Sequence, residues 1–416
     1  MNNTLKFKKD LQYYKFCFYG FFKNLRFFEP FFILFFLESG LTYLQIGIIY
    51  SLGEISRYLL EIPTGILADA MGRRKTMIAS FSFYIISFLF YFFGHSYFVF
   101  IVAMIFYSMG DAFRTGTHKA MIFDYLKMNK WENQKVYYYG HTRSYSQLGS
   151  ALSALLAGIF IFFTGVYRTV FLFAIVPYIM DLVLVSSYPK KLDGNLIRFE
   201  KGKVIANFKK VFLDFFISLK NWNILKGILN VSAFTGYYKS MKDYLQPVIQ
   251  ALAVSIPVLS MIDDKQRTAV LVGGIYFIIY LLTSFSARNS GRFTSIFTNL
   301  SRPMNLTLIL GLAIGIISGL AFEQNLLIIS VIFLVFIYLI ENLRKPTGIS
   351  FIAENSNPDI LATTLSAESQ THTLIAALIA PLLGFLADIL SLGYAIMIIS
   401  GILLLLSPMV FLKNKG

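Results

Sequence analysis

Several charged side chains interrupt long apolar stretches of the sequence, and they recur at helical spacing. Arg26 and Glu29 are three residues apart, and Asp111 and Arg114 have the same separation. Side chains three or four residues apart share one face of a helix, so each pair can form an ion pair. An ionisable group inside a membrane costs about 2.5–3.5 kcal/mol on insertion scales, which makes it a functional candidate. Such groups can bind a charged solute or exchange a proton, and the competing interpretation is a structural salt bridge.

Further candidates lie along the whole chain. Glu54, Arg57 and Glu61 are spaced i, i+3 and i+7, which predicts one helical face and suits a structural chain of charges as well as a substrate site. Lys239 could hold an anionic group or extend to the membrane interface. The residues predicted for proton coupling or the substrate cavity are Arg26, Glu29, Glu54, Arg57, Asp111, Arg114, Lys239, Asp243, Glu341 and His372.

Enzyme, cofactor and metal motifs are missing from the sequence. It contains no H-E-x-x-H or G-x-S-x-G motif, and its four histidines lie in different segments without ligand spacing. Cys17 is the single cysteine and cannot form an internal disulfide. No phosphate-binding loop of the G-x-x-x-x-G-K-[ST] type is present. We therefore expect no enzyme, no metal and no cofactor, and an ion gradient rather than ATP as the energy source.

The composition requires a membrane protein. Of the 416 residues, 56% are hydrophobic and 14% are charged, whereas soluble domains are roughly 45–50% apolar. The apolar runs are long and do not alternate with polar residues, which predicts membrane helices rather than a barrel. The net charge of +15 comes from short basic segments between apolar ones. This placement indicates how the chain is oriented in the membrane, and not nucleic-acid binding.

The apolar runs predict an all-α protein with twelve transmembrane helices, and a polar interval divides them into two sets of six. We expect an N-terminal half over 1–187, a cytoplasmic linker with an amphipathic helix over 188–221, and a C-terminal half over 222–416. A calmodulin-type target helix is the rival interpretation of the linker. The basic loops fall on one side, which predicts two cytoplasmic termini. The predicted helices are 16–38, 43–68, 76–94, 97–123, 137–163, 168–187, 222–250, 267–287, 303–322, 326–345, 362–388 and 392–412.

The segment between the second and third predicted helices carries a recognisable motif. Residues 65–75 read G-I-L-A-D-A-M-G-R-R-K, preceded by Glu61-Ile62-Pro63-Thr64. This resembles the signature loop of the major facilitator superfamily, although Ala70 replaces a residue that is basic in many members. The resemblance implies two pseudo-symmetric six-helix halves, and a role for Arg114 in proton transfer. It also implies a conformational latch formed by Glu61, Gly65, Asp69, Gly72, Arg73 and Arg74.

The resemblance implies a secondary active transporter that moves a small organic solute across the cytoplasmic (inner) membrane by alternating access. We expect proton-coupled export, that is, efflux by an antiporter. The alternatives are proton-coupled uptake of an anionic or zwitterionic metabolite, and flipping of a lipid-like substrate. The G-x-x-x-G-P-x-x-G-G motif of exporters is incomplete here, because residues 149–158 contain no proline. The expected partners are the solute, protons and the lipid bilayer, with no nucleic acid, and we expect a monomer.

Overall fold

The computed structural model describes residues 9–194, 222–257, 261–356 and 361–412. These residues form helices and their connections, with no strand among them. Nine helical segments in the described ranges are long and apolar enough to cross a membrane. The described helices follow the twelve predicted ranges in order. Most of the predicted linker lies outside the described residues, apart from its start, which includes a 3-10 turn over Lys190–Asp193.

Contacts divide the chain into two compact units. Unit 1 comprises residues 1–29 and 56–206, and unit 2 comprises residues 30–55 and 207–416. Residues 30–55 thus group with the second half of the chain, not with the helices that flank them in sequence. The predicted division into two halves, with a linker over 188–221 between them, stays a prediction.

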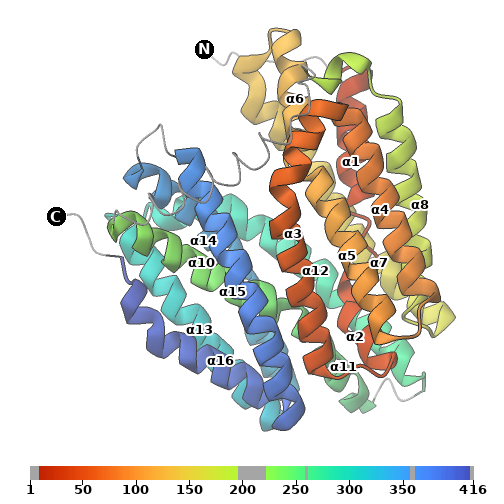
Figure 1. Ribbon diagram of the computed structural model, residues 1–416. Coiled ribbons are helices and arrows are strands. Elements are labelled where there is room, and N and C mark those ends of the chain that lie inside the picture. Colours follow the sequence, from red (N-terminus) through yellow and green to blue (C-terminus); the bar gives the residue numbers. More distant parts are fainter. Residues whose placement is uncertain (1–8, 195–221, 258–260, 357–360, 413–416) are drawn as a thin grey trace. The chain divides into compact units, whose positions relative to one another are not determined.

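Unit 1 is a set of helices that runs from α1 to α8. Asp10 starts α1 by accepting a hydrogen bond from the Tyr13 amide at 2.9 Å, and Gly165, with φ of +65°, ends α7. Helices α5 and α8 both pack against α4 (Figure 1). The helices of this unit are α1 (Leu11–Lys23), the second part of α3 (Tyr43–Met71), α4 (Arg73–Phe93), α5 (Tyr97–Arg114), α6 (Thr117–Met128), α7 (Lys135–Thr164) and α8 (Thr169–Ser186).

Two of the six helices predicted for the first half are broken. The first ends at Lys23 and resumes as a 3-10 turn, Glu29–Phe31, followed by α2 (Phe32–Glu38). Pro30 lies in that turn, where its missing N–H is no loss. The fourth is divided at Gly116, whose φ of +79° is open to glycine but strained for other residues. This break ends α5 at Arg114 and lets α6 start in a new direction.

Two glycines let α1 and α7 approach closely. A Cβ on Gly20 would lie 2.6 Å from Ser146 Oγ, and one on Gly149 would lie 2.4 Å from the Phe21 carbonyl oxygen. Small residues at such crossings allow two membrane helices to pack backbone to backbone. The polar end of α1 is thereby held beside the first half of α7.

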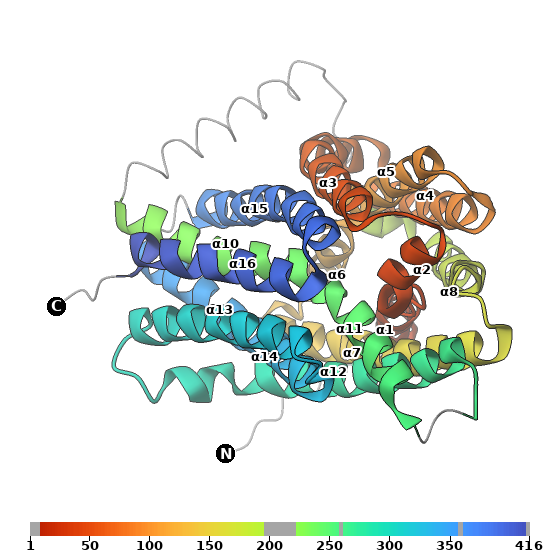
Figure 2. The same cartoon turned by 90° about the horizontal axis from the view of Figure 1, so that it is seen from below.

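Unit 2 contains α2, the first part of α3 and the helices of the second half. The seventh predicted helix is broken by a 3-10 turn, Lys242–Tyr244, within a polar stretch. Viewed from below, α13 lies along α16 and α10 along α15 (Figure 2). The helices are α10 (Trp222–Met241), α11 (Leu245–Ser255), α12 (Asp264–Thr294), α13 (Ser301–Glu323), α14 (Leu327–Asn355), α15 (Leu361–Ile389) and α16 (Leu392–Leu406).

Close packing on α15 explains why residues 30–55 belong to unit 2. A Cβ on Gly47 would lie 2.3 Å from the Ala380 carbonyl oxygen, so no larger residue fits there. Both carboxylate oxygens of Asp388 accept backbone hydrogen bonds, from the Tyr43 and Leu44 amides, each at 2.8 Å. A carboxylate at a helix N-terminus satisfies amides that have no partner within the helix. Asp388 therefore fixes the start of α3 to α15.

Candidate functional site

Asp111 lies at the centre of a polar cluster that joins three helices of unit 1. Its Oδ2 is 3.1 Å from Arg57 Nη2 of α3, and its Oδ1 is 3.3 Å from Arg114 Nη2. The Tyr84 hydroxyl of α4 donates to the same Oδ1 and accepts from Arg114 Nε at 3.2 Å. Three of the predicted residues are thus brought together. The cluster joins α3, α4 and α5.

The predicted Arg26–Glu29 pair is also in contact, whereas Glu54 pairs with a residue of the second half. Arg26 Nη1 is 3.7 Å from Glu29 Oε2, in the break between α1 and α2. Glu54 of α3 accepts a hydrogen bond at 3.0 Å from Lys239 of α10, so this pair lies within unit 2. The Glu54–Lys239 pair joins residues 185 positions apart, which no sequence spacing could indicate.

The remaining predicted residues belong to unit 2. Asp243 pairs with the neighbouring Lys242 at 2.6 Å. Glu341 is 4% exposed and accepts a hydrogen bond from Thr235 Oγ1 at 3.0 Å. Nδ1 of His372 is 3.0 Å from Glu368 Oε1, one helical turn away. Each of these residues thus makes a polar contact within its own unit.

Arg344 of α14 is buried in a network of hydrogen bonds that links neighbouring helices. It is 3% exposed, and its guanidinium donates to the carbonyl and the side-chain oxygen of Asn230, each at 2.9 Å. It also donates to Thr307 Oγ1 at 2.9 Å and to the Met304 carbonyl, and it lies over the Phe234 ring. The planar fork of arginine meets all of these acceptors at once. Arg344 therefore ties α10, α13 and α14 together.

The residues of the predicted latch surround the junction of α3 and α4. Gly72 has φ of +95°, and a Cβ there would lie 3.1 Å from the Asp193 side chain. The Arg74 amide donates to Asp193 Oδ1 at 2.8 Å, and Arg73 forms a salt bridge with Asp124 of α6. The start of α4 is thus bound to α6 and to the segment after α8.

The other predicted latch residues are Glu61, Gly65 and Asp69. Glu61 is exposed on α3. Gly65 has open space around the position of a Cβ. The side chain of Asp69 lies outside the described part of the chain.

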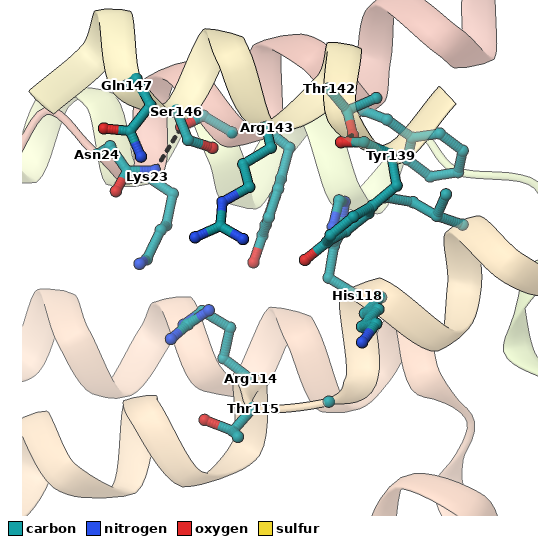
Figure 3. A pocket seen from close by; sticks show the side chains of 16 residues that line it. Lys23, Asn24, Arg114, Thr115, His118, Tyr139, Thr142, Arg143, Ser146 and Gln147 are labelled. Atoms are coloured by element: carbon teal, nitrogen blue, oxygen red, sulfur yellow. Dashed lines mark hydrogen bonds between the residues drawn. The ribbon is translucent and has the colours of Figure 1, made fainter. Parts of the chain in front are cut away.

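A cavity of about 390 Å³ opens between α1, the α5–α6 junction and α7, entirely within unit 1. Lys23 and Arg143 point into it from one side and Arg114 from the other (Figure 3). His118 and Lys119 also line the cavity, and no carboxylate belongs to its described lining. The cavity wall is therefore cationic. Of the residues predicted from sequence, Arg114 alone belongs to it.

The cavity wall also carries aromatic rings. His118 stacks on Tyr19, with ring centroids 3.5 Å apart. Its Nε2 lies 3.3 Å from the hydroxyl of Tyr188, and burial raises the pKa of Tyr188 well above its usual range. Tyr139 lines the cavity from α7, and Lys119 Nζ lies 5.7 Å from its ring centroid. An organic group could stack here while its charge meets the cations.

Sequence reasoning missed Lys23, Arg143 and Asp181. Lys23 is 8% exposed at the end of α1, where Asn24 Nδ2 donates to the Gly20 carbonyl at 2.6 Å and helps to end the helix. Asp181 is fully buried in α8. The available signal was the rule applied to the other candidates, that a charge within an apolar segment is a functional candidate.

No group of three or more His, Cys, Asp or Glu side chains that could hold a metal ion is found in the described ranges.

Comparison with known proteins identifies the family. The model of the Major Facilitator Superfamily matches residues 16–367. The chain belongs to the Major Facilitator Superfamily. It is therefore a multi-pass membrane protein of a transporter family.

Two relatives carry the same family assignment. The uncharacterized MFS-type transporter YxaM of Bacillus subtilis is 24% identical over 241 residues, covering 55% of this chain and 56% of the relative. An uncharacterized MFS-type transporter of Methanocaldococcus jannaschii is 28% identical over 211 residues, covering 50% and 51%. The chain thus spans about half the length of these curated relatives.

Solved structures of transporters share the fold. The nucleoside transporter NupG matches with a TM-score of 0.69 at 13% identity, covering 97% of this chain and 98% of that one. A bacterial homolog of the human lysosomal transporter Spinster, inward-facing and unoccupied, matches with a TM-score of 0.70 at 14% identity, covering 98% and 100%. At this identity the likeness shows the fold alone.

Proposed function

We propose that this transporter moves a small organic anion across the membrane by alternating access, coupled to protons. The observation that carries the proposal is the cavity in unit 1, which Lys23, Arg114, Lys119 and Arg143 line without a carboxylate among its described residues. Arginine forks match carboxylate and phosphate groups in geometry and charge.

The size and position of the cavity suit a metabolite-sized ligand. Its volume of about 390 Å³ lies within the range of roughly 300–1,000 Å³ that is typical of small-molecule sites. Lys23 is 8% exposed, so its ammonium group gives up most of its hydration. A bound anion would offset that desolvation, because a buried charge is costly unless it is paired.

The two main hypotheses differ in the direction of transport and in the charge of the solute. Export of an amphipathic solute is the expectation from the sequence, and uptake of an anionic or zwitterionic metabolite is its alternative. The cationic cavity favours the anionic solute.

We propose that Asp111, Arg57 and Arg114 maintain the charge balance of this region, and that the predicted latch from Glu61 to Arg74 controls the switch between access states.

We also propose that the protein lies in the inner membrane with both termini on its cytoplasmic side. The basic residues at the start of α4 and in the segment after α8 support this, since positively charged loops stay in the cytoplasm. Labelling single cysteines introduced beside Lys75 and Lys190, with a reagent that does not cross the membrane, tests the orientation. Labelling in intact cells without permeabilisation would contradict it.

Transport by purified protein in lipid vesicles tests the substrate class. We expect radiolabelled mono- and dicarboxylates or organic phosphates to cross faster than cations and neutral sugars, with a rate that follows an imposed pH gradient. Lys23→Gln and Arg143→Gln should each raise KM at least about tenfold, the factor that corresponds to about 1.4 kcal/mol of binding.

Lys190→Gln is the matched control for Lys23→Gln, because it removes the same charge at an exposed position outside the cavity. It should leave KM unchanged. Equal transport of organic cations and anions, or a Lys23→Gln variant with normal KM, would contradict an anionic substrate. Movement of a fluorescent phospholipid between leaflets would instead support the lipid-flipping alternative.

A further inference from the structure

Asp181 is an acidic residue within the apolar helix α8. Its side chain is 0% exposed, and neither carboxylate oxygen has a hydrogen-bond partner among the described residues. A buried carboxylate without hydrogen bonds is costly in its charged form. It must therefore be balanced by nearby cations or carry a proton.

The surroundings of Asp181 connect it to the cationic cavity. One turn earlier on α8, the Tyr178 hydroxyl donates to the carbonyl oxygen of Lys23 at 3.3 Å, which fixes α8 against the end of α1. Lys23 and Arg114 are the two cations that attract the Asp181 carboxylate, and both side chains also line the cavity. The titratable or charged groups that α1, α4, α5, α6, α7 and the segments after α1 and α8 bring to this region are Tyr19, Lys23, Arg26, Tyr84, Asp111, Arg114, His118, Lys119, Tyr139, Arg143 and Tyr188.

We propose that Asp181 is a proton-binding site whose proton affinity is set by the charge that Lys23 presents to the cavity. With the cavity empty, Lys23 and Arg114 balance the carboxylate. Once a negative group occupies the cavity, it competes with Asp181 for Lys23 and Arg114, and Arg114 also pairs with Asp111. The carboxylate then loses part of its compensation, and a proton binds to it more tightly. The proton passes from water to one carboxylate oxygen and forms an O–H bond there, and no other covalent bond changes.

The coupling has a definite sign. If an anion in the cavity strengthens proton binding at Asp181, a proton at Asp181 strengthens anion binding by the same factor. The anion and the proton would then occupy the protein together and cross in the same direction. This last step rests on the proposed anionic substrate, whereas the proton site and its dependence on Lys23 do not.

Infrared difference spectroscopy of the full chain in lipid vesicles, titrated with pH, tests the proton site. We expect a protonated carboxylic acid band that is lost in Asp181→Asn and shifted in frequency, but retained, in Asp181→Glu. Asp243→Asn is the matched control, because it removes a buried aspartate that is paired with Lys242 in unit 2. It should leave the band unchanged. If the Asn variant fails to insert, the Glu variant and the Lys23 variant below carry the test.

Lys23→Gln imitates the electrostatic effect of an occupied cavity without any ligand. It should raise the pH midpoint of the band by about 1–3 units, the usual effect of removing an opposite charge at close range. Lys190→Gln should not change the midpoint. Sulfate, added at constant ionic strength as a non-titrating anion probe, should raise it in the native protein and have less effect in Lys23→Gln.

The outcomes separate the two proposals. A band that depends on Asp181 and Lys23 but not on sulfate would support the proton site and count against the anion cavity. A band that Asp181→Asn leaves intact, or a midpoint that Lys23→Gln does not raise, would overturn the proton site whatever sulfate does.

Discussion

Arg57 and Asp111 lie 54 residues apart in sequence and form a salt bridge of 3.1 Å between α3 and α5. Each also belongs to a predicted pattern of charges within its own helix. The bridge between the helices converts two local patterns into one cluster, completed by Arg114 and Tyr84.

The Asp111 cluster is expected to stabilise unit 1. Asp111→Asn removes the carboxylate that two arginines share. Loss of one partner costs about 3–5 kcal/mol in a fully buried pair, and less is expected here because the Arg57 side chain is 31% exposed. The thermal unfolding midpoint of the purified protein measures the loss. Asp264→Asn is the control, since that aspartate is 66% exposed and pairs with Arg267 on the surface. Equal midpoints for the two variants would count against the cluster.

Gly72→Ala should destabilise the junction of α3 and α4. The backbone there has φ of +95° and the new Cβ would lie 3.1 Å from Asp193. A left-handed conformation costs a non-glycine residue roughly 1–2 kcal/mol, and the contact adds to it. Gly65→Ala, which meets open space in a helix, should be neutral or slightly stabilising. Denaturation of the two variants side by side checks this, and an unaffected Gly72→Ala protein would refute the prediction.

Exchanging the charges of Glu54 and Lys239 tests whether their ion pair matters to transport. Glu54→Lys and Lys239→Glu should each slow solute flux, because each places like charges where the structure has a contact of 3.0 Å. The double exchange should recover part of the flux. Coupling energies of roughly 0.5–3 kcal/mol are usual for residues in contact. Strictly additive losses in the double variant would mean that the pair is not coupled.

Arg344→Lys should be destabilising although it conserves charge. A lysine cannot donate at once to Asn230, Thr307 and Met304 as the guanidinium does. Each buried acceptor left unpaired costs roughly 1–3 kcal/mol. Arg302→Lys, at an exposed position on α13, is the control. Unfolding midpoints that match for the two variants would show that the network contributes little.

Much of the fold was predictable because hydropathy determines where a membrane helix can run. The breaks were harder to predict. The sequence shows a glycine at position 116, but it does not show that this glycine adopts a positive φ and divides the helix. The split at Lys23, which a hydrogen bond from Asn24 to the Gly20 carbonyl helps to form, was not predicted either.

The site was less predictable than the fold for a physical reason. Attention to charges at i, i+3 spacing found Asp111 and Arg114, whose contact is local. It overlooked Lys23 and Asp181, which belong to different helices and come near each other only after α1 and α8 pack. Periodicity describes one helix at a time, and the cavity is a property of several.

The break at Gly116 has a consequence for the cavity that side chains alone do not describe. It creates a new helix N-terminus, with no side-chain cap, where Gly116, His118 and Lys119 form part of the wall. The first amides of a helix carry a partial positive charge of roughly half an elementary charge. This backbone potential does not titrate and survives every side-chain substitution. Variants stripped of cationic side chains should therefore keep a residual preference for anions.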